Sequence, residues 1–153
     1  MTFEHEIALA VAPQRVWTFL WQVDRVARCL PGCEEVRTLE PHRRYAAVVK
    51  ERVGPFKVHF PLEIEVLEAA VPTHLRARAS GRDASMGSSL NVTLDLRIEG
   101  QGTGSRLVIR SEVAILGKLG TLGHGIIRPK AEGIMGQFAA AMRRELETGA
   151  AAC

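Results

Sequence analysis

The sequence lacks the features that mark several large classes of protein. Only 5% of its 153 residues are aromatic, and no strand-like segment interleaves aromatic residues with arginine as RNA-binding sheets do. No apolar run approaches the ~18 residues that cross a bilayer. No run of five like charges occurs, although lysine and arginine outnumber the acids by 20 to 17. We therefore predict no membrane-spanning segment and no nucleic-acid partner.

Cysteine is also scarce, and a secretory signal is missing. The three cysteines are an odd number without the spacing of a disulfide framework, which fits a reducing compartment. The first residues contain no basic stretch followed by an apolar one. These absences predict a cytoplasmic protein.

Motifs for cofactors and metals are absent as well. Gly117-Lys118 is followed by Leu119 instead of Ser or Thr, so the glycine-rich stretch is not a phosphate-binding loop. Cys29 and Cys33 are too far apart for a Cys-x-x-Cys redox pair, and the five histidines are too scattered to complete a zinc site. We interpret both cysteines as small buried residues that shape a loop, and we predict no cofactor and no metal.

No catalytic constellation can be assembled from the pattern either. The serines at 85, 88 and 89 lie in a turn without a Gly-x-Ser-x-Gly elbow. His59 is the candidate to check for acid–base chemistry, yet alternation places it on the wet face of a strand. The sequence therefore predicts a protein without catalytic residues.

What the chain does contain is a particular order of elements. Residues 6–11 alternate as a half-buried strand, and Pro13 suits the first position of a helix with one apolar face. Asp24 is predicted to cap a second short helix over residues 25–28. Strict alternation then predicts strands at 56–66 and 90–98, with weaker strands at 34–39, 44–52, 75–81 and 106–116. Pro61 cannot donate to a ladder and predicts an edge strand or a bulge.

A long amphipathic helix ends the chain. Its apolar stripe consists of Ile127, Ala131, Ile134, Met135, Phe138 and Met142. Pro129 allows a helix that begins near residue 128, or one that begins near residue 121 and kinks at the proline. We favour the kink, because Leu119, Leu122 and Ile126 extend the stripe backward. Glycines at 117–125 suggest a hinge before this helix.

These elements predict an α+β fold in which a curved antiparallel sheet is closed by one long helix. The short connectors predict hairpins between neighbouring strands. We assign residues 1–148 to a single domain and residues 149–153 to a frayed tail.

Four segments carry a resemblance to a known family. They read Val16-Trp17-x-Phe19-Leu20, Cys29-Leu30-Pro31-Gly32-Cys33-Glu34, Val53-Gly54-Pro55-Phe56-Lys57 and Gly117-Lys118-Leu119-Gly120-x-Leu122-Gly123. In this order they resemble the carbon monoxide dehydrogenase CoxG family of the START-like (SRPBCC) helix-grip superfamily, over residues 3–147. The resemblance implies a seven-stranded sheet that grips the C-terminal helix around a cavity. It also implies an accessory role beside a molybdenum-containing carbon monoxide dehydrogenase or related hydroxylase, with peripheral contact at the inner face of the membrane.

The predicted function is non-catalytic binding of a hydrophobic small molecule, such as a lipid or quinone, in that cavity. Two alternatives remain: a protein-docking module with a filled core, and a START-like cyclase or hydrolase. The apolar residues expected nearest the ligand are Trp17, Leu20, Trp21, Leu30, Phe56, Phe60, Met86, Leu122, Ile126, Met135 and Phe138.

Overall fold

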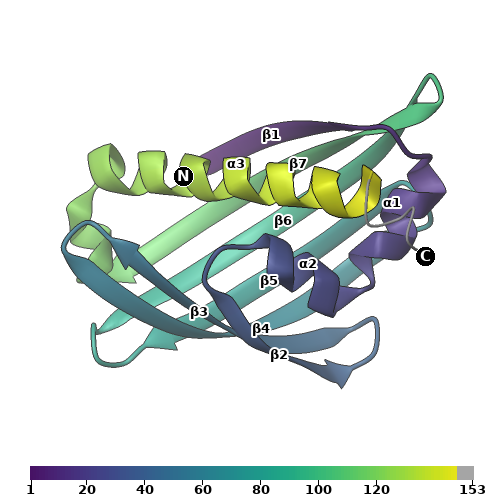
Figure 1. Ribbon diagram of the computed structural model, residues 1–153. Coiled ribbons are helices and arrows are strands. Elements are labelled where there is room, and N and C mark those ends of the chain that lie inside the picture. Colours follow the sequence, from purple (N-terminus) through teal and green to yellow (C-terminus); the bar gives the residue numbers. More distant parts are fainter. Residues whose placement is uncertain (148–153) are drawn as a thin grey trace.

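Seven antiparallel strands form one curved sheet, and a long C-terminal helix lies across its concave face (Figure 1). The computed structural model describes residues 1–147. Neighbouring strands follow the order β1-β7-β6-β5-β4-β3-β2, so β5 is the middle strand and β1 and β2 are the edges. The elements are β1 (Thr2–Leu9), α1 (Pro13–Leu20), α2 (Val23–Cys29), β2 (Cys33–Glu40), β3 (Arg44–Val53), β4 (Phe56–Ala70), β5 (His74–Asp83), β6 (Ser88–Gln101), β7 (Gly104–Gly117), the 3-10 helix η1 (Leu119–Leu122) and α3 (His124–Glu147).

The predicted fold class and strand order along the chain are confirmed. Each predicted strand is present, and most extend further than the alternation suggested, because hairpin pairing continues almost to the turns. The predicted tail at 149–153 lies outside the described residues.

One local prediction about the helices is wrong, and the favoured prediction for the last helix is right about Pro129 but not about the start. α2 begins at Val23 with Gln22 at its N-cap position, and Asp24 lies in the first turn without a capping hydrogen bond. α3 begins at His124, between the two alternatives, with Pro129 inside it. Leu119 and Leu122 belong to the separate helix η1, because Gly123 adopts a φ of 77° that ends it.

Pro61 lies in an interior strand, so the prediction of an edge or a bulge is also wrong. β4 pairs with β3 on one side and β5 on the other, and its register shift falls between Val66 and Glu68. The β4–β5 register reaches only as far as the pair Leu62↔Gly81. Pro61 therefore lies just beyond this ladder. No β5 carbonyl is paired with β4 there, so none is left without a donor by the N–H that proline lacks.

Beyond the end of that ladder, a buried carboxylate accepts hydrogen bonds from the neighbouring segments. Asp83 accepts hydrogen bonds from the backbone N–H of His59 (2.8 Å), the backbone N–H of Met86 (3.2 Å) and the hydroxyl of Ser85 (2.7 Å). Burial by itself would raise the pKa of Asp83, but the hydrogen bonds from Ser85, His59 and Met86 together hold this pKa below its usual range. Asp83 thus joins the start of β4 to the β5–β6 turn.

This arrangement predicts an acid-sensitive contribution to stability. Because the folded-state pKa of Asp83 is lowered, its contribution is complete above the unfolded-state pKa and is lost as the pH falls through the folded-state value. We expect Asp83→Asn to lower the free energy of unfolding by about 1–2 kcal/mol at pH 7. We also expect the free energy of unfolding of this variant to fall less steeply as the pH is lowered. Urea unfolding as a function of pH measures both effects. Glu4→Gln, at an exposed β1 position, is the control. The prediction would be contradicted if the stability of Asp83→Asn fell as steeply at acid pH as that of the wild type.

Two separate apolar clusters hold the fold together. The first, here the helix-end cluster, joins β1, α1 and the second half of α3 around Ile7, Val16, Leu107 and Met142. The second, here the tip cluster, joins the β3–β4 hairpin to η1 around Val58, Phe60 and Leu119. The two clusters lie toward opposite ends of α3, and part of the concave face lies between them.

Candidate functional site

The eleven predicted ligand-binding residues are divided between the two clusters. The helix-end cluster contains Trp17, Leu20 and Phe138 as buried members, with Trp21, Leu30 and Met135 packed against it. The tip cluster contains Phe60, with Phe56 and Leu122 packed against it. Met86 and Ile126 belong to neither cluster; Met86 is half-buried in the β5–β6 turn and Ile126 is 40% exposed. The structure therefore does not gather these residues into one pocket.

Four inward-facing residues that the sequence analysis did not select lie between the clusters. Ile64, Val92 and Val113 share the concave face of the sheet, and Ile134 lies on α3. All four are only half-buried and belong to neither cluster. Large aliphatic side chains on an inner face are normally buried completely. Their partial exposure shows that α3 does not cover these four side chains completely.

The middle strand adds room at the same place. The three inward positions in the middle of this strand, Ala77, Ala79 and Gly81, are small, and the larger Leu75 and Asp83 lie on either side of them. The register places Ala79 between Ile64 on β4 and Val92 on β6. Small residues on β5 therefore lie between larger ones on both neighbouring strands. We call this strip of the concave face, with Ile134 from α3, the central groove.

Helix α3 bridges the sheet on both sides of the central groove. Its backbone comes close to β1 on one side and β3 on the other. On the β3 side the Lys130 ammonium donates to the Glu51 carboxylate at 2.8 Å. That hydrogen bond holds the pKa of Glu51 below its usual range. The ion pair therefore fastens the first half of α3 to β3.

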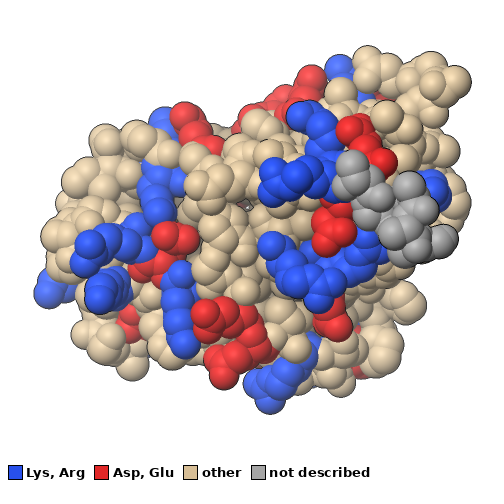
Figure 2. Space-filling model, viewed as in Figure 1, with Lys and Arg blue, Asp and Glu red and all other residues tan. Residues whose placement is uncertain are grey.

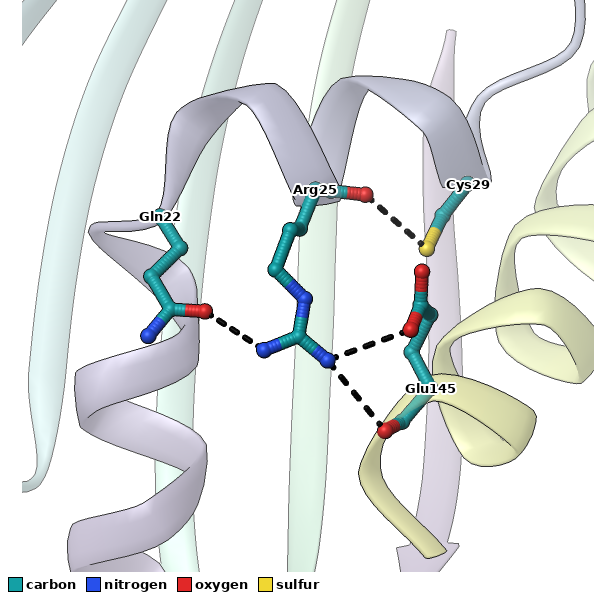
Figure 3. A network of polar contacts seen from close by, with 4 residues as sticks. All are labelled: Gln22, Arg25, Cys29 and Glu145. Carbon is teal, nitrogen blue, oxygen red and sulfur yellow. Dashed lines mark hydrogen bonds and ion pairs between the residues drawn. The ribbon is translucent and has the colours of Figure 1, made fainter. Parts of the chain in front are cut away.

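A second polar contact fastens the other end of α3 to α2 (Figure 3). The Arg25 guanidinium donates to the side chain of Glu145 at 3.1 Å and to the side chain of Gln22 at 2.7 Å. The Cys29 thiol lies beside this network and donates to the carbonyl of Arg25 at 3.4 Å. Burial and then the negative charge of Glu145 raise the pKa of the Cys29 thiol, and burial raises that of Cys33. Neither thiol therefore has the lowered pKa of a reactive cysteine.

The loop between α2 and β2 closes against β3 by a very tight contact. Gly32 has a φ of 79°, and its carbonyl accepts a hydrogen bond from the Lys50 N–H at 2.8 Å. A Cβ at position 32 would lie only 2.1 Å from the Lys50 carbonyl oxygen. The glycine of the Cys-Leu-Pro-Gly-Cys segment is therefore required by both conformation and space.

Chemically, the central groove is aliphatic. Within residues 1–147, no group of three or more histidine, cysteine, aspartate or glutamate side chains could hold a metal ion. His59 is exposed on the outer face, as its alternation predicted. A depression of about 940 Å³ lies elsewhere, with Ala46, Val48, Pro61 and Ser80 directed into it from the outer face of the sheet. Figure 2 shows mostly uncharged atoms in the middle of the α3 side of the molecule, around a narrow hollow.

The sequence matches one family model, and the fold matches several solved structures. The family described as CoxG, a carbon monoxide dehydrogenase subunit, matches residues 6–147. A conserved protein from Geobacillus kaustophilus has a TM-score of 0.86 at 17% identity, covering 96% of this chain and 95% of its own. The Zhui aromatase/cyclase from Streptomyces sp. R1128 has a TM-score of 0.64 at 17% identity, with coverage of 95% and 90%.

A third structure, Ara h 8.0201, has a TM-score of 0.66 at 14% identity and covers 97% of this chain and 98% of its own. At these identities the likenesses establish the helix-grip fold alone, which the sequence analysis predicted. No curated protein has a sequence significantly similar to this chain. In the described part of the chain, no helix is both long and apolar enough to cross a bilayer.

Proposed function

This chain belongs to the carbon monoxide dehydrogenase CoxG family, and on that premise we propose that it binds a hydrophobic small molecule in the central groove. The observation that carries the proposal is the incomplete burial of Ile64, Val92, Val113 and Ile134 on an inner face. Covering exposed apolar surface with a ligand lowers the free energy by roughly 25 cal/mol per Å². An apolar ligand is therefore the occupant that this surface favours.

The groove favours an uncharged cargo. Its side walls and floor are aliphatic at Ile64, Ala79 and Val92, where a charged group would lose its hydration without gaining a partner. Glu51 and Asp83, the nearest inward acids on their strands, are already held by Lys130 and by the donors around the β5–β6 turn. A quinone or the acyl chain of a lipid fits this description.

The accessory role follows from the family and is also a proposal. A protein that carries a quinone without transforming it would supply an electron acceptor to a partner oxidoreductase. By the family description, that partner would be a molybdenum-containing carbon monoxide dehydrogenase or a related hydroxylase. The aliphatic groove, without an acid–base pair in reach, favours transport over catalysis.

Fluorescence titration with N-phenyl-1-naphthylamine tests the binding proposal. We expect saturable binding by the folded protein and displacement of the dye by a short-chain ubiquinone analogue. Displacement by the quinone but not by a soluble anionic dye would support an uncharged cargo. A folded protein that binds neither the dye nor the quinone analogue would contradict the proposal.

A further inference from the structure

Ser111 is a buried residue whose hydroxyl has no hydrogen-bonding partner in the described part of the chain. The buried polar side chains among residues 1–147 are Asp83, Ser88, Ser105 and Ser111. Asp83 is held by three donors, and Ser88 and Ser105 each form a hydrogen bond with a backbone group. Ser111, which is 6% exposed, makes no such contact within these residues.

The Ser111 oxygen is accessible although the residue as a whole is buried. Within residues 1–147, no side-chain oxygen or nitrogen is both fully enclosed and without a partner. Because the Ser111 oxygen lacks a partner, it must be among the few atoms of this side chain that a small molecule can reach. Apolar surroundings disfavour a hydroxyl unless it forms a hydrogen bond, so this position favours a molecule that supplies an acceptor or a donor.

Ser111 lies on β7 at the border of the central groove. Alternate residues of a strand share a face, so Ser111 faces the same side as the half-buried Val113. Its partner on β6 is Leu94, which is also half-buried. Its partner on β1 is the buried Phe3, and the Arg128 guanidinium of α3 lies 4.8 Å from the centre of the Phe3 ring. The less buried neighbours of Ser111 are therefore those toward the groove.

Other inward polar groups are less suited to meet a molecule in the groove. The Tyr45 hydroxyl, on the β3 side, already accepts a hydrogen bond from the His42 N–H at 2.8 Å. His5 faces inward on β1, but it stands opposite Ile109, which is 3% exposed and belongs to the helix-end cluster. Ser111 is thus the hydroxyl that combines an accessible oxygen with a place beside the groove.

We propose that the Ser111 hydroxyl donates a hydrogen bond to a carbonyl oxygen of the molecule bound in the central groove. This inference rests on the proposed function and adds an orientation to it. The carbonyl end of the ligand lies at β7, and its hydrocarbon part extends over Val92 and Ala79. An uncharged hydroxyl among aliphatic side chains suits a carbonyl, which a quinone and an ester-linked lipid chain both contain.

Displacement of N-phenyl-1-naphthylamine by matched pairs of ligands tests the proposed hydrogen bond. Duroquinone and durene have the same ring and methyl groups, but durene lacks the carbonyl oxygens. Methyl laurate and tridecane are the corresponding pair for a lipid chain. We expect Ser111→Ala to weaken binding of at least one carbonyl compound by roughly threefold to tenfold, and to change binding of its hydrocarbon counterpart by less than about twofold. The pair that responds identifies the source of the carbonyl.

Ser105→Ala is the matched control. It removes a hydroxyl from the same face of β7, but that hydroxyl already donates to the Val11 carbonyl. The control should therefore leave the preference for a carbonyl compound over its hydrocarbon counterpart unchanged. Infrared spectra add a readout that a merely structural role would not move. The carbonyl band of the responding ligand should lie at lower frequency when it is bound to the wild type than when it is bound to Ser111→Ala.

The outcomes separate this inference from the proposed function. If Ser111→Ala binds the carbonyl compounds as well as the wild type does, or loses both members of a pair equally, the hydrogen bond is overturned and the groove remains a binding site. If the folded wild type binds none of the ligands, both proposals are overturned.

Discussion

Ala79→Leu is expected to weaken binding of apolar molecules roughly tenfold or more while leaving the fold intact. Ala79 lies on the middle strand, between Ile64 and Val92, and the proposal places its small side chain at the floor of the binding site. A leucine there occupies space that the proposal assigns to the ligand. The free energy of unfolding should change by less than about 1 kcal/mol, since an unfilled groove can accept the larger side chain. Dye titration and urea unfolding of the same preparation measure the two effects.

Ser80→Leu is the matched control for this prediction. Ser80 is adjacent on β5 but points to the outer face, where it is exposed. This variant therefore introduces the same leucine without entering the groove, and dye binding should stay at the wild-type level. If Ala79→Leu instead destabilises the protein by about 1–3 kcal/mol, the site is already packed and the docking-module alternative gains support.

Gly32→Ala is expected to lower the free energy of unfolding by about 3 kcal/mol or more. The added Cβ would lie 2.1 Å from the Lys50 carbonyl oxygen, a backbone atom that cannot rotate away. Relief of this clash would break the hydrogen bond from the Lys50 N–H to the Gly32 carbonyl. Thermal or urea unfolding measures the loss.

Gly102→Ala separates the clash from the cost of the left-handed conformation. Gly102 has a φ of 61° in the β6–β7 turn, but a Cβ there meets nothing within 4 Å. We expect this control to lose only about 1 kcal/mol. Equal losses in the two variants would mean that the contact between the α2–β2 loop and β3 is not tight.

The faces of the strands could be predicted from the sequence, but the division of the inner residues between two clusters could not. Alternation in β4 and β6 assigned Phe60 and Leu94 to the inner face, because side chains in a strand change sides at each residue. It could not say which inner residues would be packed by α1, α2 or η1, since those contacts join segments far apart in the chain. Trp17 and Phe138 consequently proved to be core residues of the helix-end cluster.

The small inward residues of β5 carried a weaker signal. Ala77, Ala79 and Gly81 alternate with arginine and serine, which marks a short inner stretch of small residues. Their meaning depends on register, because Ala79 forms a floor only when Ile64 and Val92 stand beside it. The start of α3 was missed for a different reason: its stripe continues back to Leu119, and the break comes from the backbone conformation of Gly123.

Native mass spectrometry of the purified protein, with extraction and identification of anything bound, tests the central claim most directly. The account predicts one uncharged apolar molecule per chain, either retained from the expressing cell or acquired on incubation with quinones and lipids. Ala79→Leu should carry less of it, and Ser80→Leu should carry as much as the wild type. A wild-type protein that stays empty after incubation, although folded, would contradict the assignment of the central groove as a ligand-binding site.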